Sequence, residues 1–201
     1  NANGIDRAFH IRGIGGQLTV SGATIQGGNA GSGSGGGFWV ETATNSLTLD
    51  NVILHGNSAT AGAGIDNAGN LTLTDVTIQN NGNLTTTTQG GGLRNTANAT
   101  LNRVTISGNR ADVGGGVHND FGTGNSMTLT NVTLSGNSAQ STGGGIYTRD
   151  NITVLNSTIT LNTSDTAGGI RTQTSSANLQ NTIVAGNTGV SANPDLAGTF
   201  V

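Results

Sequence analysis

The sequence predicts an all-β protein, a right-handed parallel β-helix of about seven coils of 24–29 residues each. Three observations lead to this fold. Short apolar–Thr–apolar segments recur along the whole chain, an Asn follows most of them at a fixed distance, and Gly-rich stretches separate them. Self-similarity with a period of 20 to 50 residues is the signature of a solenoid, in which each repeat packs only on its neighbours.

The repeats are aligned on the last apolar residue of the second strand expected in each coil. These anchor residues are Ile25, Leu54, Ile78, Ile106, Leu134, Ile159 and Val184. Before each anchor lies a segment such as Leu71-Thr72-Leu73 or Met127-Thr128-Leu129. Alternation of apolar and polar residues is the period of a half-buried strand. We therefore expect Leu73, Leu101 and Leu129 to share one internal file, with the Thr side chains outside.

Stacking of one coil on the next explains a composition with only 8% charged and 32% hydrophobic residues. A thin core repeated along an axis needs less apolar content than a globule. Adjacent coils would lie about 4.8 Å apart, and parallel crossovers are almost always right-handed. We expect residues 1–201 to form one domain and to be a segment of a longer secreted protein, because the first residues contain neither Met nor an apolar signal region.

An Asn column lies three residues after the anchors. Its members are Asn57, Asn81, Asn109, Asn137, Asn162 and Asn187. Stacked amides can each donate to the next, so we expect a structural Asn ladder along the axis. Asn also tolerates the left-handed backbone that a corner needs, and we expect these residues to adopt it.

Gly triplets such as Gly114-Gly115-Gly116 and Gly143-Gly144-Gly145 predict a second corner, where backbones approach closely. An inward apolar residue follows each triplet, and the next residue should point outward. This outward column contains Trp39, Asp66, Arg94, His118, Tyr147 and Arg171. Aromatic and charged groups spaced about 4.8 Å apart suit the recognition of sugars or proteins. The alternative is a solvated face with an Asp66–Arg94 contact.

The sequence indicates no catalytic residues, no metal site and no cofactor. Glycoside hydrolysis needs two carboxylates about 5–9.5 Å apart, and in this register no two acids share a column on adjacent coils. No partner carboxylate is expected beside His118. Asp75 stacks beside Arg103 and predicts a surface ion pair. The three histidines lie in different columns, and a single Gly-x-Gly-x-Asp segment at residues 62–66 does not make a calcium repeat.

Charge and hydropathy limit the partners. The net charge is −3, there is no lysine, and the seven arginines are scattered, so nucleic acid is not expected. There is no cysteine, which excludes disulfides and thiolate ligands. No apolar run of about 18 residues is present, so we expect no membrane span in this segment.

The segment Thr128–Ala139, TLTNVTLSGNSA, followed by GGGIY at 143–147, resembles the repeats of right-handed β-helix proteins of bacterial surfaces. It is similar to the polymorphic outer membrane protein type, whose repeats centre on GGA-I and F-x-x-N. Here the motifs are GGG-I and Leu134-Ser135-Gly136-Asn137, with Leu134 in place of Phe. The resemblance covers nearly the whole chain and implies a secreted or cell-surface protein; the fold it implies hosts adhesins, lyases and filaments alike.

Three functions remain open at this stage. The preferred hypothesis is a non-enzymatic extracellular structural or adhesive module. Its partners would be cell-surface glycans or proteins, and its β-helix ends could stack on one another to form filaments. The second is a β-helix enzyme of the polysaccharide lyase or hydrolase type. The third is a polysaccharide-binding module that uses the face between Trp39 and Tyr147.

Overall fold

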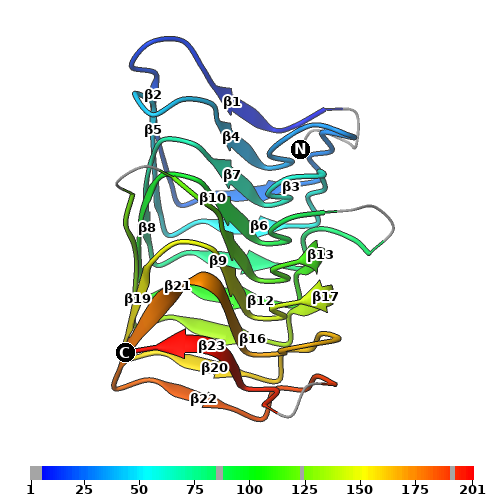
Figure 1. Cartoon of the computed structure of the whole chain (residues 1–201). Helices are drawn as coiled ribbons and strands as arrows, with labels where there is room; N and C mark the ends of the chain where they lie inside the picture. The colour runs from blue at the N-terminus through cyan, green and yellow to red at the C-terminus, as the bar shows by residue number, and fades with distance from the viewer. Residues whose placement is uncertain (1–5, 85–87, 123–124, 191–192) are drawn as a thin grey trace.

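The computed structural model describes residues 6–84, 88–122, 125–190 and 193–201. In these ranges the chain forms 23 strands and no helix. The strands stack as the rungs of a column that runs from β1 (Phe9–Ile11) at one end to β22 (Ile183–Ala185) at the other (Figure 1). None of the described segments is a helix of the length and apolarity that a membrane crossing requires.

The column has three faces, each built from one parallel strand per coil. The first face carries the outward column predicted above. Its strands are β1, β4 (Phe38–Val40), β7 (Ile65–Asn67), β10 (Leu93–Asn95), β14 (Val117–Asn119), β18 (Ile146–Thr148) and the start of β21 (Ile170–Gln180).

The second face carries the apolar–Thr–apolar segments. Its strands are β2 (Gln17–Ser21), β5 (Ser46–Asp50), β8 (Asn70–Thr74), β11 (Asn98–Asn102), β15 (Met127–Thr130), β19 (Ile152–Leu155) and the end of β21. Because β21 runs through the bend without interruption, it joins the first two faces into one sheet.

The third face carries the anchor residues in a seven-stranded parallel sheet. Its strands are β3 (Thr24–Gln26), β6 (Ile53–His55), β9 (Thr77–Gln79), β12 (Thr105–Ser107), β16 (Thr133–Ser135), β20 (Thr158–Thr160) and β22. Two further strands, β13 (Arg110–Val113) and β17 (Ser138–Thr142), pair beside the Gly corner. The last strand, β23 (Leu196–Phe200), pairs with β21.

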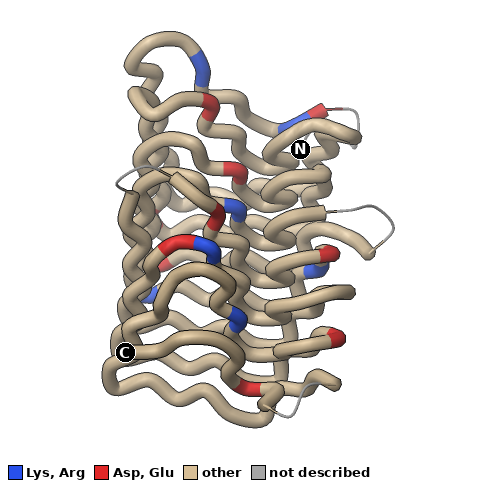
Figure 2. Tube along the Cα trace, in the orientation of Figure 1, with Lys and Arg blue, Asp and Glu red and all other residues tan. Residues whose placement is uncertain are grey.

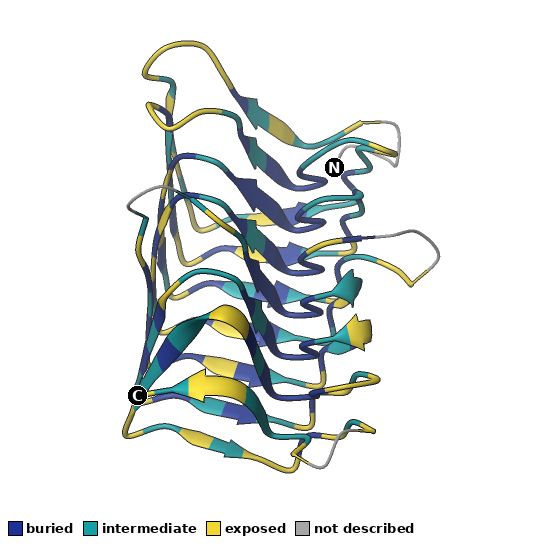
Figure 3. Cartoon of the chain, viewed as in Figure 1, coloured by how far each residue is buried: buried dark blue, intermediate teal, exposed yellow. Residues whose placement is uncertain are grey.

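The strand register confirms the predicted parallel β-helix. Leu73 pairs with Leu101 and Leu101 with Leu129, and all three side chains are 0% exposed. The buried apolar residues form one continuous cluster along the axis. In Figure 3 buried segments, coloured dark blue, recur in coil after coil of the column. Each Leu or Ile therefore gains its contacts from its equivalents in the coils above and below.

The Asn ladder is a continuous chain of hydrogen bonds inside the column. Each member donates from both its backbone N–H and its side-chain Nδ2 to the Oδ1 of the next, at 2.9–3.0 Å, from Asn57 through to Asn187. Nδ2 also donates to an anchor carbonyl of the preceding coil, as from Asn109 to Ile78 O at 2.9 Å. At its end the ladder stops on Asp195, whose Oδ1 accepts both donors of Asn187 at 2.9 Å.

The expectation of left-handed backbone at the ladder residues is wrong. The left-handed position is the residue before each ladder Asn, which is usually Gly but is Asn80 or Leu161 in two coils, with φ of 53° and 57°. This residue turns the chain so that the following Asn side chain is directed into the interior, where it is almost fully buried. A second left-handed column, which includes Asn131, forms the bend between the second and third faces.

That bend carries the predicted Asp75–Arg103 pair. The guanidinium donates from Nε and Nη2 to the two carboxylate oxygens, both at 2.7 Å. Both side chains are about half exposed. The hydrogen bonds from Arg103 lower the pKa of Asp75. The ion pair therefore links two adjacent coils on the outer surface of the column.

The Gly corner requires Gly because the coils come so close there. A Cβ on Gly116 would lie 2.6 Å from the carbonyl oxygen of Gly145, and a Cβ on Gly92 would lie 2.7 Å from that of Gly116. The first Gly of the triplet has a different reason, since Gly114 and Gly143 both have φ of 66°. The corner thus folds back tightly over the strand that follows it.

Candidate functional site

The six residues of the predicted outward column lie side by side on consecutive strands of the first face. The strand pairs align Trp39, Asp66, Arg94, His118, Tyr147 and Arg171 in that order. The same register adds His10 before Trp39 and Ala197 after Arg171. We call these eight residues the outward strip.

The strip is less solvated than the sequence indicates. Asp66 and His118 point away from the core, yet only 3% and 2% of their surface is exposed. The reason lies in the Gly corner, which leans over the strip. A Cβ on Gly114 would lie 2.8 Å from the Cβ of His118, and a Cβ on Gly62 would lie 2.6 Å from the Cα of Asp66. The Gly corner therefore covers this part of the strip.

The first segment of the strip is an aromatic stack. The rings of His10 and Trp39 lie 4.0 Å apart and nearly parallel, and the Arg7 guanidinium lies 4.8 Å from the Trp39 ring. Glu41 approaches His10 Nε2 at 3.3 Å. Burial lowers the pKa of His10, although Glu41 acts against this effect. Arg7, His10 and Trp39 are thus stacked on one another, with the Glu41 carboxylate beside the imidazole.

The middle segment is a chain of alternating charges across four coils. Arg94 contacts Asp66 and Asp120, each at 3.2 Å, and Arg149 contacts Asp120 at 3.1 Å. Arg94 Nε also donates to Gln89 Oε1 at 3.2 Å. Figure 2 shows acidic and basic positions following one another down this face. The guanidinium groups are thereby occupied by the protein itself.

His118 lies within this charge chain. Its pKa is lowered to about 4, mainly by burial and also by the Arg94 and Arg149 cations, while Asp120 acts in the opposite direction. Neither ring nitrogen has a hydrogen-bond partner among the described residues. The Tyr147 ring meets the imidazole edge-on, with centroids 5.0 Å apart. His118 is therefore a neutral, buried ring at neutral pH.

The expectation of no carboxylate beside His118 is wrong, because the Asp120 carboxylate is near enough to raise the pKa of His118. Asp120 is also linked to Asp66, because Arg94 forms an ion pair with both. Burial raises the pKa of Asp120, but the hydrogen bond from the Phe121 N–H and the nearby cations outweigh burial, and the net shift is downward. A general acid for polysaccharide cleavage needs the opposite shift. Asp120 thus serves as an ion-pair acceptor.

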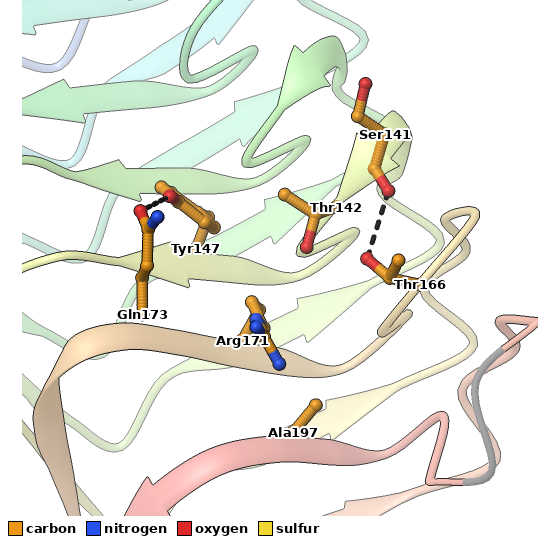
Figure 4. Close-up of a pocket in the computed structure, with 7 residues that line it drawn as sticks. All are labelled: Ser141, Thr142, Tyr147, Thr166, Arg171, Gln173 and Ala197. Carbon is orange, nitrogen blue, oxygen red and sulfur yellow. Dashed lines mark hydrogen bonds between the residues drawn. The ribbon is translucent and has the colours of Figure 1, made fainter.

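The last segment opens into a groove with a volume of about 390 Å³ (Figure 4). We call it the C-terminal groove. Its lining residues come from β17, β18, β21 and β23 and the corner beside them: Ser141, Thr142, Tyr147, Thr166, Arg171, Gln173 and Ala197. The Tyr147 hydroxyl is hydrogen-bonded to Gln173, and burial raises the pKa of Tyr147. Figure 4 shows the Arg171 side chain between Thr142 and Ala197.

The sequence reasoning missed two further columns on the first face. Glu41, Asp120, Arg149 and Gln173 lie two residues beyond the strip, where the period of two again directs side chains outward. Between the two outward columns lies a buried second ladder, in which Asn67 Nδ2 donates to Asn95 Oδ1 at 2.7 Å and Asn95 Nδ2 to Asn119 Oδ1 at 2.9 Å. The recurrence of Asn one residue after the strip is the signal that would have found it.

Among the described residues, no three His, Asp or Glu side chains converge in a way that would hold a metal ion. The predicted site residues are thus brought together as one file, in three segments of different character. Two segments are closed by internal contacts, and the third is an open groove.

Comparison with known proteins identifies one repeat. Residues 131–149 match the family model of the Chlamydia polymorphic membrane protein repeat. The match runs from the left-handed bend at Asn131, through the ladder residue Asn137 and the Gly corner, to Tyr147 on the strip and Arg149 beyond it. No curated protein and no solved structure matches the chain significantly. The chain is therefore a parallel β-solenoid that carries a polymorphic membrane protein repeat, as the resemblance indicated, and it is consistent with a bacterial surface β-helix protein.

Proposed function

We propose that the chain is a non-enzymatic, extracellular adhesive module, which presents the first face of the solenoid to glycans or proteins of a cell surface. The observation that carries this proposal is the outward strip, in which one side chain per coil is fixed on a continuous parallel sheet. A rigid array loses little conformational entropy on binding.

The electrostatics of the strip favour binding over catalysis. Asp66 and Asp120 share the Arg94 guanidinium, and the pKa of Asp120 is lowered. Acid–base catalysis on a glycan needs one carboxyl with a raised pKa and a second at a fitting distance. A scaffold of paired charges, by contrast, holds neighbouring side chains in position without taking part in chemistry.

Adhesion is tested with the purified chain coupled to beads and applied to cultured epithelial cells. We expect the beads to be retained, and retention to fall when Trp39 and Tyr147 are both replaced by Ala. Thr100→Ala is the control, because Thr100 is exposed on the second face in β11. Uncoated and coated beads that bind equally would refute the adhesive function.

The enzymatic alternative has its own measurement. The chain is incubated with acidic polysaccharides, with and without calcium, and new chain ends are quantified. We expect no turnover. Turnover that disappears in His118→Ala or Asp66→Ala would replace the adhesive proposal with a polysaccharide-degrading function.

Self-association through the coil ends is a second proposal. The outer edges of β3 and β22 have no strand partner in the described part of the chain, and the exposed Ile183 lies in β22. Unpaired edges are templates for further strands. Fibres in negative-stain micrographs would support end-to-end stacking, and monodisperse particles at all concentrations would rule it out.

A further inference from the structure

We infer that the C-terminal groove binds a carboxylate-bearing saccharide, with Arg171 as the residue that recognises the uronate carboxylate. This inference rests on the proposed adhesive function and names the ligand class of its open segment. It is distinct from the Trp39 end of the strip, where the aromatic and charged groups stack on one another.

Arg171 differs from the paired arginines of the chain in its charge environment. Arg94, Arg103 and Arg149 each contact a carboxylate, at 2.7–3.2 Å. Arg171 makes no ion pair and no hydrogen bond with any described residue, and all ten acidic residues of the chain are among those described. Arg171 is half-buried on the floor of the groove, and its planar guanidinium matches a carboxylate with two parallel hydrogen bonds.

The rim of the groove is polar. Thr142 lines the groove, and its buried hydroxyl has no hydrogen-bond partner among the described residues, so it is free to bond a ligand hydroxyl. Thr166 Oγ1 donates to Ser141 O at 3.0 Å, and Ser141 Oγ donates to Asp112 Oδ1 at 2.5 Å. These bonds fix the rim opposite Arg171. The Gln173 amide lies on the other side and is held by the Tyr147 hydroxyl.

The size and lining of the groove suit a sugar. The volume of about 390 Å³ lies at the small end of the range for ligand sites, which suits a sugar unit or two. The apolar surfaces offered by the lining are the Tyr147 ring, the Ala197 methyl and the Thr methyls. A pyranose has apolar C–H faces and a rim of hydroxyls, so it fits this mixture. An acidic peptide would need a deeper apolar pocket for an anchoring side chain, which these lining residues do not form.

The residues of the groove are held on a rigid sheet. Tyr147, Arg171 and Ala197 stand on three consecutive paired strands, β18, β21 and β23, so their backbone spacing is set by the sheet. The ring of Tyr147 is also held edge-on by the buried His118. The site is therefore preformed, and binding requires little reorganisation.

The test is calorimetric titration of the whole chain with a short galacturonate oligosaccharide and with the matching neutral galactose oligosaccharide. We expect measurable binding of the galacturonate and at least tenfold weaker binding of the neutral sugar. Arg171→Gln should weaken galacturonate binding about tenfold to a hundredfold, because a hydrogen-bonded charge pair is lost. Arg171→Lys should retain part of the affinity. Arg12→Gln is the matched control, since it removes the same charge from an exposed turn at the opposite end of the column.

Three results would overturn the inference: equal affinity for the charged and neutral sugars, an unchanged affinity in Arg171→Gln, or an equal loss in Arg12→Gln. The bead assay separates this inference from the adhesive proposal. Retention of the beads on cells without galacturonate binding would refute the ligand class alone. Galacturonate binding without retention would refute adhesion and leave the ligand class standing. Circular dichroism of each variant establishes that the fold is intact.

Discussion

Replacement of Asn109 by Ala should remove about 4 kcal/mol from the free energy of unfolding. The side chain takes part in four hydrogen bonds: Nδ2 donates to Ile78 O at 2.9 Å and to Asn137 Oδ1 at 3.0 Å, and Oδ1 accepts two bonds from Asn81 at 3.0 Å. A net hydrogen bond contributes about 1 kcal/mol, which gives the total. The site is 0% exposed, so water cannot replace the lost partners.

The assay is urea unfolding followed by circular dichroism, with the slope of the transition compared between variants. Asn178→Ala is the control. Asn178 is half-buried on β21 and has no side-chain hydrogen bond to a described residue, so its replacement should change stability by less than about 0.5 kcal/mol. If Asn109→Ala unfolds at the same urea concentration as Asn178→Ala, the hydrogen bonds of the ladder do not stabilise the fold.

Three further predictions use the same unfolding measurement. Leu161→Gly should stabilise the chain by about 0.5–1 kcal/mol, because Leu161 is 66% exposed and has a left-handed backbone with φ of 57°. The control is Ile183→Gly. Ile183 is also exposed, but its backbone is not left-handed, so this replacement should destabilise the chain. Gly116→Ala should cost about 3 kcal/mol, because its Cβ would lie 2.6 Å from a carbonyl oxygen, and Gly56→Ala, at φ 63° in open space, only about 1 kcal/mol. The pKa of His118 is 6.5 in the unfolded chain and about 4 in the folded one, so protonation of His118 favours unfolding. The free energy of unfolding should therefore fall by about 3 kcal/mol between pH 6.5 and pH 4. The variant His118→Leu should show a weaker pH dependence over this range.

The fold could be predicted from the sequence because equivalent residues of successive repeats contact one another when the coils stack. The Leu73, Leu101 and Leu129 file was predictable because the period of two and the repeat length leave one arrangement that buries all three. The order of the outward strip was predictable for the same reason, since register fixes neighbours.

The burial of the side chains in the outward strip could not be predicted from the repeat alignment. Burial of Asp66 and His118 depends on how far the Gly corner leans over the strand, which is set by backbone geometry. The link from Arg94 to Asp120 was missed because it crosses between two outward columns that the alignment treats separately. The second ladder escaped notice because Thr148 takes over from Asn after Asn119.

Because the Asn ladder ends on Asp195, it limits where coils can be added to or removed from the solenoid. Every coil presents one acceptor to the coil before it and two donors to the coil after it, so any complete coil can be removed or duplicated without leaving an amide unmatched. A segment that is not a whole coil would shift every file at once. Asp195 supplies a carboxylate oxygen where a further coil would supply an Asn, and it does so from within its own coil. Growth or shrinkage by recombination should therefore occur between Asn57 and Asn187, upstream of that closing residue.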